Sequence, residues 1–231
     1  TPASLISPVS LKINGRRWNI GCLLCEDGWS DNYEMNPMKL LREAGNIDFY
    51  VNISSSPYTL GKNEKRHRVF GAEAKAAQAP VFYVNNVGLQ DNGKTVYTFD
   101  GSSAVYNSAG VCVAAAKPYE EKLNLLDFSE ISALPPVIHE SSSEISQIYE
   151  ALSYGIRKFL SKIRMEKVVI GASGGIDSAV AAALYTSVLG AENVLLVNMP
   201  SRFNSETTKG LAHELAQNLG CYYATFPIQE S

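Results

Sequence analysis

The residues best placed to do chemistry form a short loop rich in glycine and serine, with the sequence Gly171-Ala172-Ser173-Gly174-Gly175-Ile176-Asp177-Ser178. The β-branched run 167–170 precedes it, and apolar residues at helical spacing follow it, so the pattern predicts a loop between a strand and a helix. Glycines let the backbone approach a ligand, and the unpaired amides of a helix N-terminus attract negative charge. The loop is therefore predicted to hold phosphate.

Asp177 indicates what accompanies the phosphate. No lysine follows the glycines, which excludes a Walker A loop, and the spacing is not that of the dinucleotide fingerprint. A carboxylate beside phosphates requires a cation between them, so Asp177 is predicted to bind Mg²⁺ together with a nucleotide that carries a pyrophosphate. The simpler alternative is a glycine-rich turn in which Asp177 or a serine caps the following helix.

Cys25 is a second candidate. The hydrophobic run 21–25 ends abruptly at Glu26 and Asp27, which predicts a strand through Cys25 with the thiol at the edge of a loop. A thiol there is a candidate nucleophile, and the alternative is a buried cysteine that serves only in packing. Cys22 and Cys25 would face opposite sides of a strand, so their C-x-x-C spacing does not indicate a metal or redox site.

The elements around Cys25 alternate between strands and helices. An Asn14-Gly15 pair predicts a hairpin turn within 11–20. A succession of three strands toward residue 115 predicts that the sheet ends antiparallel. The expected helices span 37–44 and 62–77, and the expected strands span 47–54, 80–86, 96–99, 102–107 and 110–115.

The elements around the phosphate loop predict the opening of a doubly wound parallel sheet, whose ligand site falls at the carboxyl ends of its strands. Gly190 and Gly220 are expected to end two helices in the left-handed conformation. We expect a first domain over 1–128, a linker over 129–143 and a second domain over 144–231. The elements expected in the second domain are a helix at 145–163, strands at 167–170, 194–197 and 221–226, and helices ending at Leu189 and Leu219.

Composition limits the classes of partner. The chain has 231 residues and a net charge of −3, without a basic block, so nucleic acid is not an expected partner. No apolar run is long enough to span a membrane, and the N-terminus lacks a signal-peptide pattern, so we expect a cytoplasmic protein. Cysteines 22, 25, 112 and 221 lie in apolar runs and are expected to be reduced, buried thiols.

The motifs resemble known families. Ser-Gly-Gly-x-Asp-Ser after a strand resembles the N-type ATP pyrophosphatases, which adenylate an acid and let ammonia displace AMP, and the segment 199–205 is similar to NAD synthetases. The Cys25 strand, 52–58 and 99–103 resemble the nitrilase-type glutaminases that are fused to NAD synthetases. This implies an α/β fold: the C-terminal half of a nitrilase-like α-β-β-α sandwich, then the start of an adenine nucleotide alpha hydrolase-like parallel sheet.

The resemblance also implies roles for individual residues. Cys25 would attack the side-chain amide of glutamine, and the pocket for glutamine would include Glu26, Ser56 and Lys62, the last standing where some relatives have arginine. The loop 171–178 would bind ATP with Asp177 on Mg²⁺. Less specifically, Asn198, Met199 and Ser201 would contact the adenine or ribose. The implied small-molecule partners are glutamine, nicotinic acid adenine dinucleotide and ATP, and a homo-oligomer is expected.

One departure from the family pattern bears on activity. Nitrilase-type glutaminases use a Glu general base and a Lys upstream of the Cys, but residues 1–24 contain no acidic residue and only Lys12, Arg16 and Arg17 as cations. We therefore expect an internal fragment of a longer enzyme, inactive alone as a glutaminase. None of His67, His139 and His213 is placed to serve Cys25, and the charged run 63–68 is expected to be a solvated helix face.

The implied function is ATP-dependent amidation of nicotinic acid adenine dinucleotide to NAD through an acyl-adenylate, with ammonia released from glutamine at Cys25. Two alternatives stay open on the sequence. One is another ATP-pyrophosphatase amidotransferase, which would share the phosphate loop. The other is a catalytically incomplete nucleotide-binding subunit, which the missing upstream Glu and Lys would favour.

Overall fold

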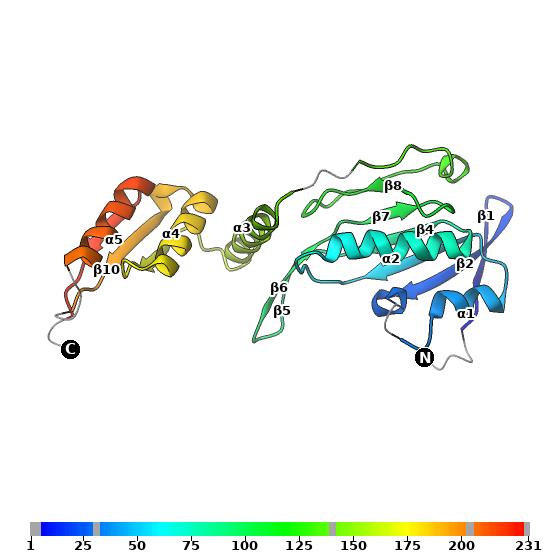
Figure 1. The fold of residues 1–231 in the computed structure, drawn as a ribbon, viewed down its shortest axis with the longest axis horizontal. Helices are drawn as coiled ribbons and strands as arrows, with labels where there is room; N and C mark the ends of the chain where they lie inside the picture. The colour runs from blue at the N-terminus through cyan, green and yellow to red at the C-terminus, as the bar shows by residue number, and fades with distance from the viewer. Residues whose placement is uncertain (1–5, 30–32, 139–141, 202–205, 229–231) are drawn as a thin grey trace. The chain divides into compact units, whose positions relative to one another are not determined.

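The computed structural model describes residues 6–29, 33–138, 142–201 and 206–228, and the side chains of 206–209 are not described. The chain divides into two compact units, Thr1–Gln147 and Ile148–Ser231. Each unit has its own sheet (Figure 1). No helix within the described ranges combines the length and apolar character needed to cross a membrane.

The first unit is built on a six-stranded sheet with the order β1-β2-β3-β4-β7-β8. β1 and β2 form the expected hairpin, and Asn14 (φ +50°) and Gly15 (φ +81°) make its turn, a conformation that an Asn-Gly pair adopts readily. β2, β3 and β4 run parallel, whereas β7 and β8 are antiparallel, as expected. The strands are β1 (Val9–Ile13), β2 (Arg16–Leu24), β3 (Phe49–Ser54), β4 (Val81–Asn85), β7 (Ala104–Tyr106) and β8 (Cys112–Ala115).

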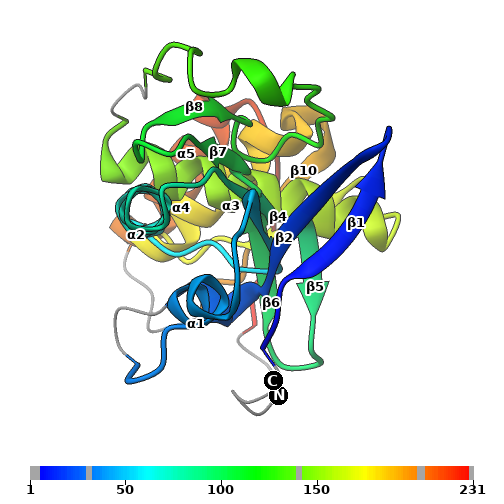
Figure 2. The same cartoon turned by 90° about the vertical axis from the view of Figure 1, so that its right-hand side faces the viewer.

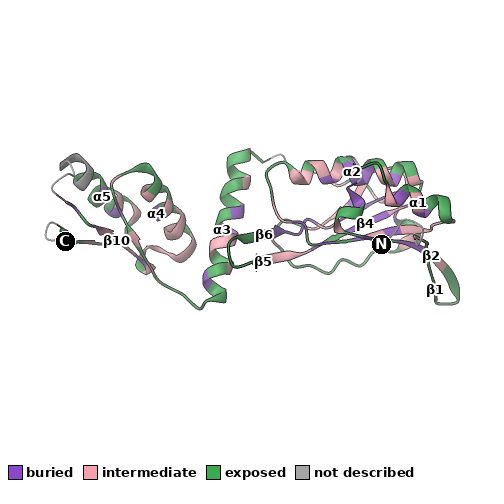
Figure 3. Ribbon diagram, turned by 90° about the horizontal axis from the view of Figure 1, so that it is seen from below, coloured by how far each residue is buried: buried purple, intermediate pink, exposed green. Residues whose placement is uncertain are grey.

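Two helices cover one face of this sheet, α1 (Pro37–Ala44) and α2 (Lys62–Ala77), both with the bounds expected from the sequence. Figures 1 and 2 show them on the same side of the strands, and Figure 3 shows buried residues gathered in α2 and the central strands. A Cβ at Gly71 of α2 would lie 2.8 Å from the carbonyl oxygen of Gly110, so only glycine allows this approach. The main core lies here: Leu23, Met38, Leu41, Tyr50, Val69, Phe70, Ala74, Val81, Tyr83, Ala104 and Tyr106.

The opposite face of the sheet is covered only in part. Phe128, which begins the short 3₁₀ helix η4 (Phe128–Glu130), packs its ring against Trp18 and Phe49 of the sheet, with centroids 4.8 and 5.5 Å apart. Nearer the carboxyl ends of the strands, Leu24 pairs with Ile53, and Ile53 pairs with Val84. These three side chains form an exposed apolar row, 67%, 58% and 49% accessible.

A second, two-stranded sheet corrects the expectation for residues 87–91. β5 (Val87–Asp91) pairs antiparallel with β6 (Val96–Asp100), whereas the sequence predicts a strand only for the second of these. Gly88 in β5 has φ +142°, and its strand alternates poorly between apolar and polar residues. The cysteine expectation is also partly wrong, because Cys22 is exposed and none of the four thiols is fully buried.

The second unit contains a parallel sheet with the order β11-β10-β9, as expected for the opening of a doubly wound fold. α4 and α5 pack on one face of it through Ala182, Ala212 and Ala216. The other face leaves Val169 and Tyr222 more than 60% accessible. The elements are most of α3 (Glu144–Lys162), which begins in the last residues of the first unit, and β9 (Val168–Gly171), α4 (Ile176–Leu189), η5 (Ala191–Asn193), β10 (Val194–Asn198), α5 (Glu206–Leu219) and β11 (Tyr222–Thr225).

Glycine follows α4 and α5 as expected, but one of the two differs in conformation. Gly220 has φ +71°, whereas Gly190 has φ +87° with ψ 148°, which is outside the left-handed helical region. The chain turns directly from Gly190 into η5, so this glycine starts a new turn instead of closing a left-handed cap.

Candidate functional site

β2 ends at Leu24, one residue earlier than the sequence predicts. Cys25 follows it directly and begins the 3₁₀ helix η2 (Cys25–Gly28). Its φ of +44° is in the left-handed region, which residues other than glycine rarely adopt and which concentrates at functional sites. Two hydrogen bonds hold the turn: the amide of Leu24 donates to Asp27 Oδ2 at 3.0 Å, and the amide of Trp29 donates to the Glu26 carbonyl at 2.9 Å. The partly exposed thiol is thereby held at the sheet edge.

Four of the residues predicted from the sequence line one cavity of about 410 Å³, and they come from three separate segments of the chain. These are Cys25 and Glu26 after β2, Ser56 after β3, and Lys62 at the start of α2. Parallel strands bring their carboxyl ends to the same edge of a sheet, which explains why the segments after β2 and β3 meet. The remaining lining residues are Trp29, Pro57, Thr59, Leu60, Gly61 and Lys65.

The cavity carries groups of both charges. Lys62 Nζ donates to the carbonyl of Pro57 at 3.1 Å, and Lys62 and Lys65 place their ammonium groups 5.9 and 5.4 Å from the centre of the Trp29 ring. Burial, and then the charge of Arg66, lower the pKa of Lys62. The Tyr33 hydroxyl donates to Glu26 Oε1 at 2.7 Å. A small ligand with both an ammonium and a carboxylate group would find complementary charges here.

The charged run 63–68 is not the solvated helix face that the sequence predicts. Arg66 is 1% accessible and makes an ion pair with Asp100, and His67 is half-buried, its Nδ1 sharing a hydrogen bond of 2.9 Å with the Tyr106 hydroxyl. Arg66 shares the buried stripe of α2 with Val69 and Phe70. That helical spacing is a signal for burial, but nothing local identifies Asp100, 34 residues away, as its partner.

The loop 171–178 joins β9 to α4, as predicted, with Gly175 at the N-cap of α4 and Gly174 at φ +83°. Its two hydroxyls close the loop: Ser173 Oγ accepts from the amide of Gly175 at 3.2 Å, and Ser178 Oγ donates to the carbonyl of Gly175 at 2.9 Å. The two hydroxyl oxygens are 3.2 Å apart. The loop is exposed except at Ala172 and partly at Gly174 and Ser178, so most of its surface is open to a ligand.

The other ATP-site candidates lie at the end of β10, which pairs with β9. Asn198 is buried at the last position of the strand, and Met199 Cε would be 3.6 Å from a Cβ built on Gly171. Ser201 follows two residues later and is half-buried. The rest of the motif, 202–205, lies outside the described residues.

Asp177 is exposed in the first turn of α4. Among the described residues, no group of three or more His, Cys, Asp or Glu side chains could hold a metal ion. A hard cation takes oxygen ligands and often combines one or two carboxylates with phosphate oxygens. The donor set here, one carboxylate beside serine hydroxyls, therefore fits Mg²⁺ that arrives with a nucleotide and does not fit a cage made of protein ligands alone.

Comparisons with known proteins match the second unit by itself and also most of the chain. The NAD synthase family model matches residues 148–231. Glutamine-dependent NAD(+) synthetases of Synechocystis sp. and Aquifex aeolicus are 35% and 32% identical, over 90% and 96% of this chain. The chain spans 38% and 43% of the length of these relatives.

A solved structure shows the same fold. The glutamine-dependent NAD+ synthetase from Acinetobacter baumannii, in complex with ADP, superposes on this chain with a TM-score of 0.80 at 30% sequence identity. The match covers 96% of this chain and 40% of the Acinetobacter chain. The enzyme from Cytophaga hutchinsonii shares the fold at 18% identity, with a TM-score of 0.68. The expected α/β fold is confirmed, and so is the resemblance to the glutamine-dependent NAD(+) synthetases, with residues 148–231 matching the NAD synthase family model.

Proposed function

We propose that this chain is part of an enzyme that releases ammonia from glutamine at Cys25 and uses it, with ATP, to convert nicotinic acid adenine dinucleotide to NAD. The observation that carries the proposal is the convergence of Cys25, Glu26, Ser56 and Lys62 on one cavity, in a chain whose second unit matches the NAD synthase family. The relatives at 30% identity and above support the same pairing of activities.

In the first unit, the Cys25 thiolate attacks the side-chain carbonyl carbon of glutamine. The amide N–H of Glu26 stabilises the oxyanion, and as the tetrahedral intermediate collapses, the proton released by the thiol passes to the leaving nitrogen, so ammonia departs and a glutamyl thioester remains. Water then attacks the thioester, so glutamate leaves and the thiol is restored. Lys62 faces the α-carboxylate and Glu26 the α-ammonium group, which orients the side chain toward Cys25. Residues 1–24 offer no carboxylate to accept the thiol proton.

In the second unit, the amides of the loop 171–178 and the N-terminus of α4 bind the phosphates of ATP. Asp177 would hold Mg²⁺, with Ser173 and Ser178 beside it, and the ion when bound offsets negative charge on the phosphates. The nicotinate carboxylate attacks the α-phosphorus and displaces pyrophosphate, which gives an acyl-adenylate. Ammonia then attacks the acyl carbon and displaces AMP, which gives the amide. Asn198, Met199 and Ser201 are proposed to contact the adenosine.

The test separates two sources of ammonia in the full-length protein. With Cys25→Ala, glutamine-driven NAD formation is expected to fall by at least about 10³-fold, because the nucleophile is gone, whereas formation driven by ammonium chloride continues. Cys22→Ala is the matched control, since Cys22 lies on β2, three residues before Cys25, and is exposed and outside the cavity lining. Retention of glutamine-driven activity in Cys25→Ala would exclude the assigned nucleophile.

A further inference from the structure

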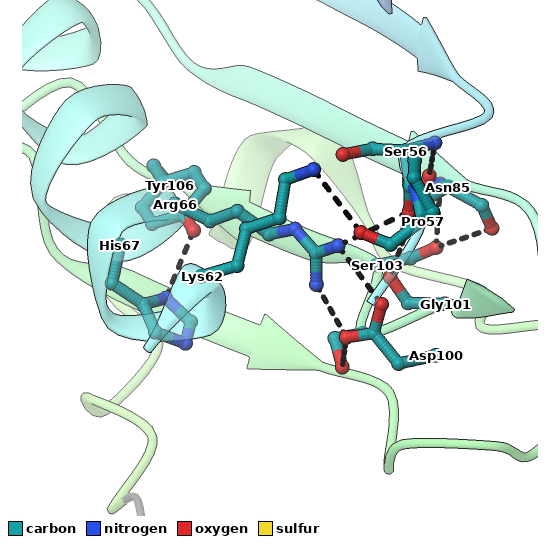
Figure 4. A network of polar contacts seen from close by, with 11 residues as sticks. Ser56, Pro57, Lys62, Arg66, His67, Asn85, Asp100, Gly101, Ser103 and Tyr106 are labelled. Atoms are coloured by element: carbon teal, nitrogen blue, oxygen red, sulfur yellow. Dashed lines mark hydrogen bonds and ion pairs between the residues drawn. The ribbon is translucent and has the colours of Figure 1, made fainter. Parts of the chain in front are cut away.

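A buried ion pair lies directly behind the wall of the Cys25 cavity. Arg66 and Asp100 are 1% and 3% accessible. Arg66 Nη1 pairs with Asp100 Oδ2, and Arg66 Nη2 donates to Asp100 Oδ1 at 2.9 Å, so the contact is bidentate (Figure 4). Ser102 Oγ also donates to Asp100 Oδ2, at 3.0 Å. Burial by itself would lower the pKa of Arg66, but the hydrogen bonds that Arg66 donates to Asp100, together with the charge of that carboxylate, outweigh burial and raise it, so Arg66 stays charged.

The same guanidinium reaches the cavity wall. Arg66 Nη2 donates to the carbonyl of Ser56 at 3.3 Å, and Ser56 lines the cavity. Asn85 makes two further hydrogen bonds to Ser56. Its Oδ1 accepts from the Ser56 amide at 2.8 Å, and its Nδ2 donates to the Ser56 carbonyl at 3.2 Å. Asn85 Nδ2 also donates to the carbonyl of Gly101, next to Asp100, at 2.9 Å. The position of Ser56 is thus fixed by residues of α2, β4 and β6.

The network extends to Lys62, one of the two lysines that line the cavity. Lys62 precedes Arg66 by one helical turn on α2, and its ammonium group donates to the carbonyl of Pro57, the residue after Ser56 (Figure 4). A shift of the segment 56–57 would therefore move both a wall residue and the partner of Lys62. Arg66 itself does not line the cavity, so any effect on a ligand acts through these neighbours.

A role in stability alone would not require this geometry. Well-packed apolar residues replace buried ion pairs with little loss, and often with a gain, of stability. What an apolar pair cannot supply is a planar fork that binds a carboxylate with two nitrogens and still donates to a carbonyl. Lysine offers one point charge and cannot satisfy Asp100 and the Ser56 carbonyl in the same way.

We propose that Arg66 and Asp100 are positioning residues that fix the Ser56–Pro57 wall, and through it Lys62, in the geometry that binds glutamine. This proposal rests on the proposed function, whose glutaminase site it deepens. It predicts that the pair controls the binding of glutamine and leaves the reaction with free ammonia unaffected.

The experiment uses the full-length protein with Arg66→Lys, Arg66→Met and Asp100→Asn. Steady-state rates are measured with glutamine and, separately, with ammonium chloride. Alkylation of Cys25 by iodoacetamide, followed by mass spectrometry at increasing glutamine, reports binding without NAD formation. Arg16→Lys is the matched control, because Arg16 pairs with Asp48 in the same unit through an exposed contact of 3.5 Å.

Arg66→Lys is expected to raise KM for glutamine, and the glutamine concentration that protects Cys25, by about tenfold or more, because small displacements at a site have large effects. The ammonia-driven rate and the Arg16→Lys control remain unchanged. Arg66→Met and Asp100→Asn are expected to show the same split, because both remove the bidentate contact.

Folded variants with unchanged KM for glutamine and unchanged protection would overturn the proposal. So would failure of all three variants to fold, since the pair would then serve only to stabilise the unit. Cys25→Ala distinguishes these results from failure of the proposed function: if that variant keeps glutamine-driven activity, the glutaminase assignment itself is wrong, whatever the Arg66 variants show.

Discussion

The two candidate sites of this chain are built in opposite ways. The Cys25 cavity takes residues from three segments and fixes its wall with a buried network that joins α2, β4 and β6. The loop 171–178 is one continuous segment, largely exposed, and its two serine side chains form hydrogen bonds with the loop's own backbone and with each other. A site that orients a small ligand by side-chain charges requires rigid support from elsewhere, whereas a site that binds phosphate by amides carries most of its geometry locally.

The strongest contrast is expected from Asp177→Asn. It should reduce both glutamine-driven and ammonia-driven NAD formation by about 10²–10³-fold, the usual loss when one group that stabilises developing charge is removed. Release of glutamate from glutamine should persist, the reverse of the Cys25→Ala result. Glu214→Gln, at an exposed position of α5, is the matched control. Unimpaired ammonia-driven synthesis in Asp177→Asn would contradict the role of the loop.

Gly174→Ala tests whether the backbone of the loop sets its function. At φ +83°, alanine is strained by about 1–2 kcal/mol, so ATP binding measured by titration calorimetry should weaken by about 5- to 30-fold. Gly210→Ala, in α5 with open space around it, should instead stabilise the fold by about 0.5–1 kcal/mol in denaturant titrations. Equal ATP affinity in Gly174→Ala would show that the loop tolerates another conformation.

Lys62→Arg tests the charges of the cavity. Because burial, and then the charge of Arg66, lower the pKa of Lys62, its ammonium form is lost at a lower pH than that of an ordinary lysine, which titrates near 10.4. KM for glutamine should therefore rise with pH by about fivefold, since ion pairs at such sites contribute up to about 1 kcal/mol. Arginine stays charged, so the variant should show no such rise. Lys65→Arg is the control, and an identical slope in both variants would exclude Lys62.

The smallest effect is expected for the thiols outside the cavity. Burial raises the pKa of the Cys112 thiol to about 11, so at pH 8 it should resist iodoacetamide while the exposed Cys22 reacts. Glutamine should protect Cys25 and leave the labelling of Cys22 unchanged. Peptide mass spectrometry measures all three sites together. Protection of Cys22 would indicate a general conformational change instead of occupancy of the cavity.

The contrast also explains what the sequence could predict. The loop between a strand and a helix at 171–178, the Asn14-Gly15 hairpin and the bounds of α1 and α2 follow from local patterns, and the structure agrees with them. Cys25, Glu26, Ser56 and Lys62 were identified as one pocket only through family resemblance, because no local signal brings them together. β5 was missed because its residues lack a clear alternation. The burial of Arg66 depends on Asp100, a partner remote in the sequence.

The contact of Gly71 with Gly110 has a consequence for variation among related proteins. The two backbones meet so closely that any larger residue at either position would push α2 outward. Lys62 and Arg66 lie on that helix. A mutation of Gly71 or Gly110 would therefore weaken the use of glutamine relative to free ammonia, although neither glycine lines the cavity. Screens for enzymes that prefer free ammonium salts could therefore recover changes at these two remote positions.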